Sequence, residues 1–85
     1  MDILVYSHSN CIYCNHQKQW MKENNIEFQE KDILTDQESY MEFLKIKAPG
    51  TPFTIIKTEE TEHQIIGFNK DELTTLLIQK NTVEQ

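Results

Sequence analysis

The sequence is poor in glycine and proline, with two of each among 85 residues. Hydrophobic residues make up 38% of the chain and charged residues 26%, a composition typical of a folded globular protein and unlike that of a disordered tail. A chain of this length supports one modest hydrophobic core. We therefore expect a single domain over residues 1–85.

Basic residues and long hydrophobic runs are also scarce. Eight basic residues stand against fourteen acidic ones, and the formal charge of -6 repels nucleic-acid phosphates and anionic lipids. Hydrophobic runs such as Ile3 to Tyr6 fall far short of the ~20 residues that span a bilayer, and the start Met1-Asp2 lacks the basic region of a signal peptide. We expect a cytoplasmic, monomeric protein that binds neither nucleic acid nor membrane.

Cysteine occurs only twice, in the motif Cys11-Ile12-Tyr13-Cys14. The cytosol is reducing, so a permanent structural disulfide is uncommon there, and a bridge between such close neighbours adds little loop entropy. The pair is therefore expected to be reactive or to bind a metal.

The pattern of hydrophobic residues predicts alternating strands and helices. Ile3 to Tyr6 is typical of a buried strand, and the polar loop Ser7 to Asn10 precedes a helix that should begin near Cys11 and end at Asn24-Asn25. Ile26 to Ile33 is interpreted as a second strand, and the runs Phe53 to Thr58 and His63 to Ile66 as an antiparallel hairpin.

Two further helices are predicted from capping residues. Thr35 and Glu38 match a capping box ahead of a helix that Ala48-Pro49-Gly50 should end, and Asn69 with Glu72 should cap the last helix. The resulting order is β-α-β-α-β-β-α. Because the first β-α-β unit needs a parallel crossover and the hairpin an antiparallel pair, we expect an α/β protein with a four-stranded mixed sheet and three helices. This is the order of the thioredoxin-like fold.

The motif Cys11-Ile12-Tyr13-Cys14 is suited to disulfide chemistry only at the start of a helix. Ideal helical Cβ atoms at this spacing lie ~5–6 Å apart, whereas a disulfide needs ~3.5–4.5 Å. At a helix start the backbone can deviate, and its free N–H groups and dipole stabilise a thiolate, with thiol pKa values of ~3.5–7.5 at such sites. We assign Cys11, nearer the free N–H groups and solvent, as the nucleophile, and Cys14 as the resolving thiol.

Two alternatives to redox chemistry remain open at this point. His8, Cys11, Cys14 and His16 are close enough in sequence to form a metal site, although zinc sites of this kind usually bring in a second, distant pair of ligands. The cysteines could also be two inert buried thiols. The redox interpretation is preferred, with no bound cofactor and no metal.

Together with Thr51-Pro52 and Gly67-Phe68, the cysteine motif resembles the glutaredoxin family, and within it the NrdH-redoxin group that supplies electrons to ribonucleotide reductase. The resemblance implies that Pro52 is a cis-proline beside the cysteines, leaving the backbone of Thr51 free to pair with an extended substrate or glutathione. It also implies that Tyr13, Gly67 and Phe68 line the substrate groove. A turn glycine and a core aromatic are the alternative for the last two.

Departures from the glutaredoxin pattern bear on the electron donor. His8 stands where similar glutaredoxins carry Lys, and Gly67-Phe68-Asn69-Lys70 replaces a Gly-Gly-X-Asp segment. The Gly-Phe-X-X-Asp run ending at Asp71 resembles NrdH-redoxins, which are typically reduced by thioredoxin reductase with NADPH, whereas glutaredoxins use glutathione. The resemblance thus implies protein disulfides as substrates, ribonucleotide reductase among them, and either reductant.

The remaining assignments concern single side chains. Ile12 beside Cys11 adds apolar surface for a protein partner, and His8 is a candidate auxiliary proton donor, although loop histidines are most often solvated. His16 and His63 are expected at the surface. The larger aromatic side chains are expected in the core: Tyr6, Trp20, Phe28, Phe43 and Phe53.

Overall fold

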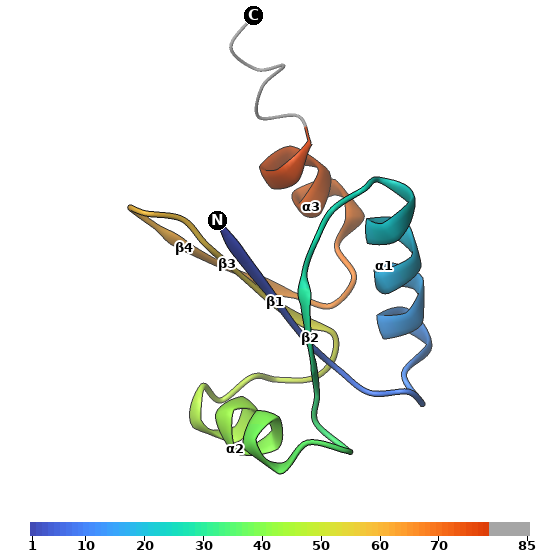
Figure 1. Ribbon diagram of the computed structural model, residues 1–85, viewed down its shortest axis with the longest axis vertical. Coiled ribbons are helices and arrows are strands. Elements are labelled where there is room, and N and C mark those ends of the chain that lie inside the picture. Colours follow the sequence, from blue (N-terminus) through green and yellow to red (C-terminus); the bar gives the residue numbers. More distant parts are fainter. Residues whose placement is uncertain (79–85) are drawn as a thin grey trace, which may run out of the picture.

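The computed structural model describes residues 1–78 and has the predicted order of elements (Figure 1). The elements are β1 (Asp2–Ser7), α1 (Ile12–Glu23), β2 (Gln29–Asp32), α2 (Gln37–Lys45), β3 (Phe53–Lys57), β4 (Glu62–Ile66) and α3 (Lys70–Leu77). The strands form one mixed sheet in the order β2-β1-β3-β4. The predicted fold class is confirmed.

The register of the sheet brings the two segments singled out by the sequence to one end. β1 pairs parallel with β2 and antiparallel with β3, and Tyr6 lies opposite Phe53. The loop that follows β1 and the segment that precedes β3 therefore meet at the same end of the sheet. Cys11 lies in the first of these segments, and Pro52 in the second.

Helices cover both faces of the sheet (Figure 1). On the face of α1 and α3, the core contains Ile3, Val5, Met21, Ile56, Ile65 and Leu73. On the face of α2, a second cluster contains Tyr6, Phe53 and Ile55. Of the aromatic residues expected in the core, Tyr6 and Phe53 are fully buried, whereas Trp20, Phe28 and Phe43 are partly buried against it.

The second strand is shorter than predicted because the residues after α1 still form hydrogen bonds with the last turn of that helix. Asn24 caps α1 as expected, and Asn25 adopts a left-handed conformation with φ of 57°. The N–H of Ile26 then still donates to the carbonyl of Met21, at 2.8 Å. As a result, β2 begins only at Gln29, and Ile26 packs against the core from outside the strand.

The predicted capping box of α2 is wrong, although the helix is present. The N-cap is Asp36, whose side chain caps no backbone N–H but accepts a hydrogen bond from Ser39 Oγ at 2.6 Å. The Asp32 carboxylate accepts the backbone N–H groups of Leu34 and Thr35, at 2.9 and 3.1 Å. These bonds form a turn that delays the helix by one residue, and the Leu34 N–H holds the pKa of Asp32 below its usual value.

The other helix ends are set by local backbone geometry. α2 ends at Lys45, before the predicted stop at Ala48-Pro49-Gly50, because Lys47 takes a left-handed φ of 57°. The predicted cap of α3 is confirmed, since Asn69 Oδ1 accepts the N–H of Glu72 at 3.1 Å. No helix within residues 1–78 has the length and hydrophobicity to cross a membrane.

Candidate redox site at the start of the first helix

Cys11 and Cys14 are joined by a disulfide at the start of α1, with their Cα atoms 5.2 Å apart. Cys11 is the N-cap residue and has an extended backbone, with φ of -99° and ψ of 110°. Its Sγ accepts the backbone N–H of Cys14 at 3.1 Å. The sulfur therefore takes the place of the oxygen that usually caps a helix, and the predicted position of the pair is confirmed.

The two cysteines differ in exposure. Cys11 is partly exposed, whereas Cys14 is completely buried on the face of α1 that packs against the sheet. A substrate sulfur can therefore reach Cys11 from solvent, but it cannot reach Cys14 directly.

The loop before α1 is held by hydrogen bonds of its own backbone and of the Asn15 side chain. The His8 carbonyl accepts the N–H of Cys11 at 3.2 Å, and Asn15 Nδ2 donates to the Ser9 carbonyl at 3.3 Å. The His8 side chain is half-buried, and its Nδ1 atom is buried without a hydrogen-bond partner among residues 1–78. His8 is thus less solvated than a loop histidine usually is.

The Thr51-Pro52 peptide bond is cis, as the resemblance implied. Pro52 is buried, and its carbonyl accepts the N–H of Gly67 at 2.9 Å, so the two downstream motifs are in direct contact. Neither the N–H nor the carbonyl of Thr51 forms a hydrogen bond with any residue in the described part of the chain. This backbone can therefore pair with an added extended segment.

Gly67 and Phe68 connect β4 to α3. Gly67 has a φ of +72°, which favours glycine. The Phe68 ring packs against Trp20, with ring centroids 6.2 Å apart, and contacts the core cluster. These placements match the turn glycine and core aromatic that the sequence allowed as an alternative.

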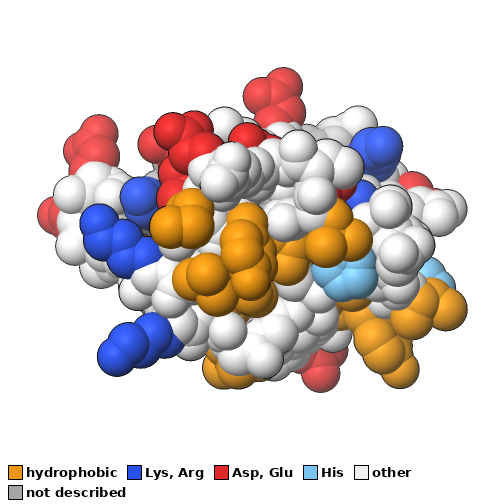
Figure 2. Space-filling model, turned by 90° about the horizontal axis from the view of Figure 1, so that it is seen from below, with side chains coloured by type: hydrophobic (Ala, Val, Ile, Leu, Met, Phe, Trp, Pro, Cys, Tyr) orange, Lys and Arg blue, Asp and Glu red, His pale blue; other side chains and the backbone are white. Residues whose placement is uncertain are grey.

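Exposed hydrophobic side chains lie beside the cysteines. Ile12 and Tyr13 are each 62% exposed, and the Tyr13 ring meets His16 edge-on at 6.2 Å. Figure 2, a view of the molecule from below, shows a hydrophobic group with histidine nearby on the side where α1 lies. We call Ile12 and Tyr13 the active-site rim.

The described residues contain no cluster of side chains that would support a metal site. Within residues 1–78, no group of three or more His, Cys, Asp or Glu side chains is arranged to hold a metal ion. His16 and His63 are exposed, as expected. Both cysteine sulfurs are occupied by the disulfide.

Charged side chains on α1 and the neighbouring strands are paired with other side chains. Lys18 on α1 pairs with Glu30 at 2.6 Å, and Ser7 Oγ donates to the same carboxylate at 3.1 Å. Further away, the Tyr6 hydroxyl donates to Glu42 Oε1 at 3.0 Å. Burial, this hydrogen bond and the Glu42 charge raise the pKa of Tyr6 to about 12.

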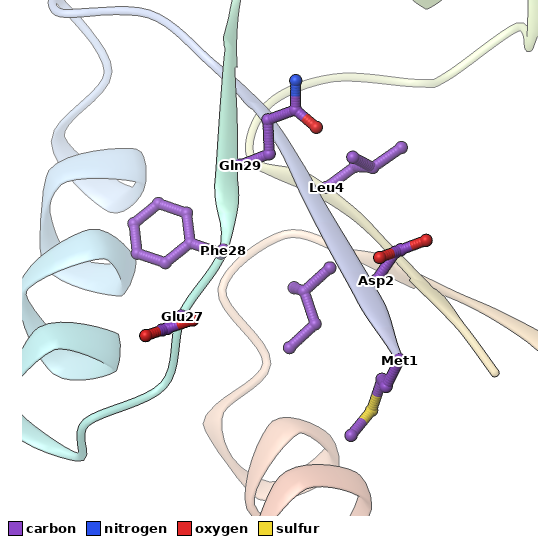
Figure 3. A pocket seen from close by; sticks show the side chains of 7 residues that line it. Met1, Asp2, Leu4, Glu27, Phe28 and Gln29 are labelled. Carbon is purple, nitrogen blue, oxygen red and sulfur yellow. The ribbon is translucent and has the colours of Figure 1, made fainter.

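A small hollow of about 240 Å³ lies between the starts of β1 and β2 (Figure 3). It is lined by residues from Met1 to Leu4 and from Glu27 to Gln29. Cys11 follows the opposite, carboxyl end of β1. The hollow is therefore separate from the redox site.

The buried polar side chain of Gln17, on the same helix as the cysteines, was not predicted from the sequence. Gln17 is completely buried on α1, between Cys14 and Met21, which share its face of the helix. The helical spacing of those two residues was visible in the sequence and would have marked Gln17 as a buried polar side chain.

A mixed four-stranded sheet with a Cys-X-X-Cys disulfide capping its first helix defines a thioredoxin-like protein. A family model described as Glutaredoxin matches residues 3–60. The chain therefore belongs to the glutaredoxin family. This membership, together with the Cys11–Cys14 pair, supports a thiol–disulfide redox function.

Curated relatives include regulators and a protein of similar size. The global transcriptional regulator Spx 1 of Bacillus cereus is 31% identical over 74 residues, covering 84% of this chain and 56% of the regulator. The chain thus spans little more than half of that relative. A glutaredoxin-like 8.6 kDa protein in a rubredoxin operon of Clostridium pasteurianum is 30% identical over 76 residues, covering 88% of this chain and 96% of the relative.

Solved structures agree with this fold. A thioredoxin-like protein is 28% identical, with a TM-score of 0.77 over 89% of this chain and 94% of the other. NrdH-redoxin from Escherichia coli is 20% identical, with a TM-score of 0.74 over 89% of this chain and 95% of the other. The second likeness concerns the fold alone.

Proposed function

We propose that this protein reduces disulfides in partner proteins by a dithiol mechanism in which Cys11 attacks and Cys14 resolves. The unequal placement of the two sulfurs is the observation that carries this proposal. Cys11 is partly exposed and accepts a backbone N–H, whereas Cys14 is buried one turn further along α1.

In the first step the Cys11 thiolate attacks one sulfur of the substrate disulfide. A bond forms between Cys11 Sγ and that sulfur, the substrate S–S bond breaks, and the second substrate sulfur leaves as a thiolate that takes a proton from solvent. The Cys14 N–H, which donates to Cys11 Sγ at 3.1 Å, stabilises the negative charge on Cys11 before the attack.

In the second step Cys14 loses its proton and attacks Cys11 Sγ. The internal disulfide forms, the mixed disulfide breaks, and the second substrate thiol is released. Two electrons and two protons have then passed to the substrate. The oxidised protein needs a reductant to start again.

The substrate is proposed to bind across the backbone of Thr51, beside Pro52. The free backbone N–H and carbonyl of Thr51 can pair with an extended substrate segment as a neighbouring strand would. The active-site rim of Ile12 and Tyr13 offers apolar contact. Gly67, whose N–H donates a hydrogen bond to the Pro52 carbonyl, is proposed to line the substrate groove next to Pro52. Phe68 contributes through its backbone, because its ring packs against Trp20.

Thioredoxin reductase with NADPH is the proposed reductant, in preference to glutathione. His8 stands in place of the lysine of similar glutaredoxins, and the nearby Lys18 is already paired with Glu30. Ribonucleotide reductase is one proposed substrate. We further propose a cytoplasmic monomer of one domain, with no bound cofactor and no metal.

A coupled assay tests the reductant. Oxidised protein is mixed with thioredoxin reductase and NADPH, or with glutathione, glutathione reductase and NADPH, and NADPH oxidation is followed with insulin or oxidised ribonucleotide reductase as substrate. The proposal predicts turnover in the first system. Turnover only with glutathione would support the glutathione-dependent alternative and contradict the proposed reductant.

Single cysteine variants test the assigned roles. Cys14→Ser should trap a mixed disulfide between Cys11 and the substrate, visible as a mass adduct that dithiothreitol removes. Cys11→Ser should form no such adduct and should lose dithiol activity. An active Cys11→Ser protein would show that the roles are wrong.

A further inference from the structure

A buried polar side chain lies directly behind the cysteine pair. Cys14, Gln17 and Met21 are all 0% exposed and form one stripe on the face of α1 that packs against the sheet. Gln17 is the uncharged polar member of an otherwise apolar stripe. Burial of an amide group is unfavourable unless its donors and acceptor are hydrogen-bonded.

The nitrogen of this amide is bonded, but its oxygen is not. Gln17 Nε2 donates to Thr54 Oγ1 on β3 at 2.7 Å and lies 3.8 Å from Met21 Sδ. Gln17 Oε1 is buried and has no hydrogen-bond partner within residues 1–78. In the disulfide form, the protein therefore carries an unpaired buried acceptor.

The position of Nε2 indicates where this oxygen faces. The nitrogen donates to Thr54 Oγ1 on the sheet and also faces Met21 Sδ, one turn closer to the C-terminus of α1, and the oxygen is the other arm of the same planar amide. Helical side chains also lean toward the N-terminus, and Cβ atoms three residues apart are ~5–6 Å from each other. Both considerations favour a position of Oε1 toward Cys14, the preceding residue of the stripe.

We propose that Gln17 is a positioning residue of the redox site whose Oε1 accepts a hydrogen bond from the Cys14 thiol in the reduced protein. When a dithiol reduces the protein, two electrons break the Cys11–Cys14 bond and the dithiol becomes a disulfide. One of its two protons goes to Cys14 Sγ and the other to Cys11 or to solvent. Cys14 then has a donor, and Gln17 Oε1 gains the partner that it lacks in the disulfide form.

This hydrogen bond stabilises the dithiol relative to the disulfide, so Gln17 makes the protein a stronger oxidant than it would be with an apolar side chain here. The inference rests on the redox role proposed for the cysteine pair. It does not depend on which substrate or reductant the protein uses.

The first test compares Gln17→Met with Gln19→Met in equilibrium with reduced and oxidised dithiothreitol. Gln19 lies on the exposed side of the same helix, so it is a matched control. Gln17→Met should shift the equilibrium toward the protein disulfide by about tenfold, which is about 30 mV for a two-electron couple. Gln19→Met should leave it unchanged. An unchanged equilibrium in Gln17→Met would overturn the inference.

The second test observes the thiol itself and needs no change at Gln17. In Cys11→Ala, Cys14 is the only cysteine, and the infrared S–H stretching band reports whether its proton is bonded. The band should lie at the frequency of a thiol bonded to an amide oxygen and should rise to that of a free thiol when Gln17→Met is added. A free-thiol band in Cys11→Ala would overturn the inference.

These results separate the inference from the proposed function. If the cysteine pair reduces protein disulfides but Gln17→Met shifts neither the equilibrium nor the band, the proposal for Gln17 is wrong and the function stands. If both shifts are observed but no protein disulfide is reduced, the Gln17 hydrogen bond is supported and the proposed function fails.

Discussion

The backbone N–H of Cys14 donates a hydrogen bond to Cys11 Sγ at 3.1 Å, so the sulfur of one cysteine caps the helix that carries the other. A single orphan donor at the helix start thereby serves two purposes. It is satisfied as part of the helix cap, and it stabilises negative charge on the sulfur that is proposed to attack the substrate.

The capping role predicts a difference between two variants that both lack the disulfide. Cys11→Ser retains a side-chain acceptor for the Cys14 N–H, whereas Cys11→Ala removes it. Under reducing conditions, Cys11→Ser should be more stable by about 1 kcal/mol in urea unfolding. Equal midpoints and slopes for the two variants would show that the cap contributes nothing to stability.

The order of elements could be predicted because it depends on local patterns. The hydrophobic run of β1, the polar loop after it and the Asn69 cap of α3 each carry their signal in a few neighbouring residues. The start of α2 could not be predicted, because Asp32 at the end of β2 accepts the N–H groups of Leu34 and Thr35, and the Thr35 N–H is the one that Glu38 would accept in the predicted capping box. The Asp32 carboxylate therefore replaces Glu38 as the acceptor of the Thr35 N–H, and the capping box does not form.

The site was predictable to the same extent. The motif fixed Cys11 at the helix start, and the family resemblance supplied the cis bond before Pro52. The partial burial of His8 and the Gln17–Thr54 hydrogen bond depend on how α1 and its preceding loop pack on the sheet. No local pattern encodes that packing, so these features emerged only from the structure.

Asn69 provides a second test of helix capping. Its Oδ1 accepts the Glu72 N–H at 3.1 Å, so Asn69→Ala should destabilise the protein by about 1 kcal/mol in urea unfolding. Thr75→Ala on the exposed face of α3 is the matched control and should not be destabilising, because alanine is the better helix former. A similar loss in both variants would point to a general effect on α3 instead of a cap.

The contact between Tyr6 and Glu42 predicts a loss of stability at high pH. Burial, the hydrogen bond and the Glu42 charge raise the pKa of Tyr6 from 10.0 to about 12, so folding favours the protonated phenol. The stabilisation is complete below pH 10 and is lost as the pH rises toward 12, by an amount on the order of 2 kcal/mol. Urea unfolding across this range measures the decline.

Tyr6→Phe is the variant that tests this assignment. Its stability should decline less than that of the wild type above pH 10, because the titrating group is gone. The Glu42 side chain is 39% exposed, so its carboxylate stays hydrated in the variant. Tyr40→Phe, on the exposed side of α2, should retain the wild-type decline. Parallel pH profiles for the wild type and Tyr6→Phe would contradict the assignment.

Because the active-site rim is exposed, a substitution there should change the recognition of protein substrates without changing the stability of the fold. Ile12 is 62% exposed, so Ile12→Ala should change the free energy of unfolding by less than about 0.5 kcal/mol. If the rim contacts protein substrates, kcat/KM for a protein disulfide should fall about tenfold, whereas kcat/KM for a small disulfide should change little. Met41→Ala is the matched control, since Met41 is 57% exposed on α2, away from the cysteines. An equal fall for both substrates would mean that Ile12 acts on the reactivity of Cys11 and not on partner binding.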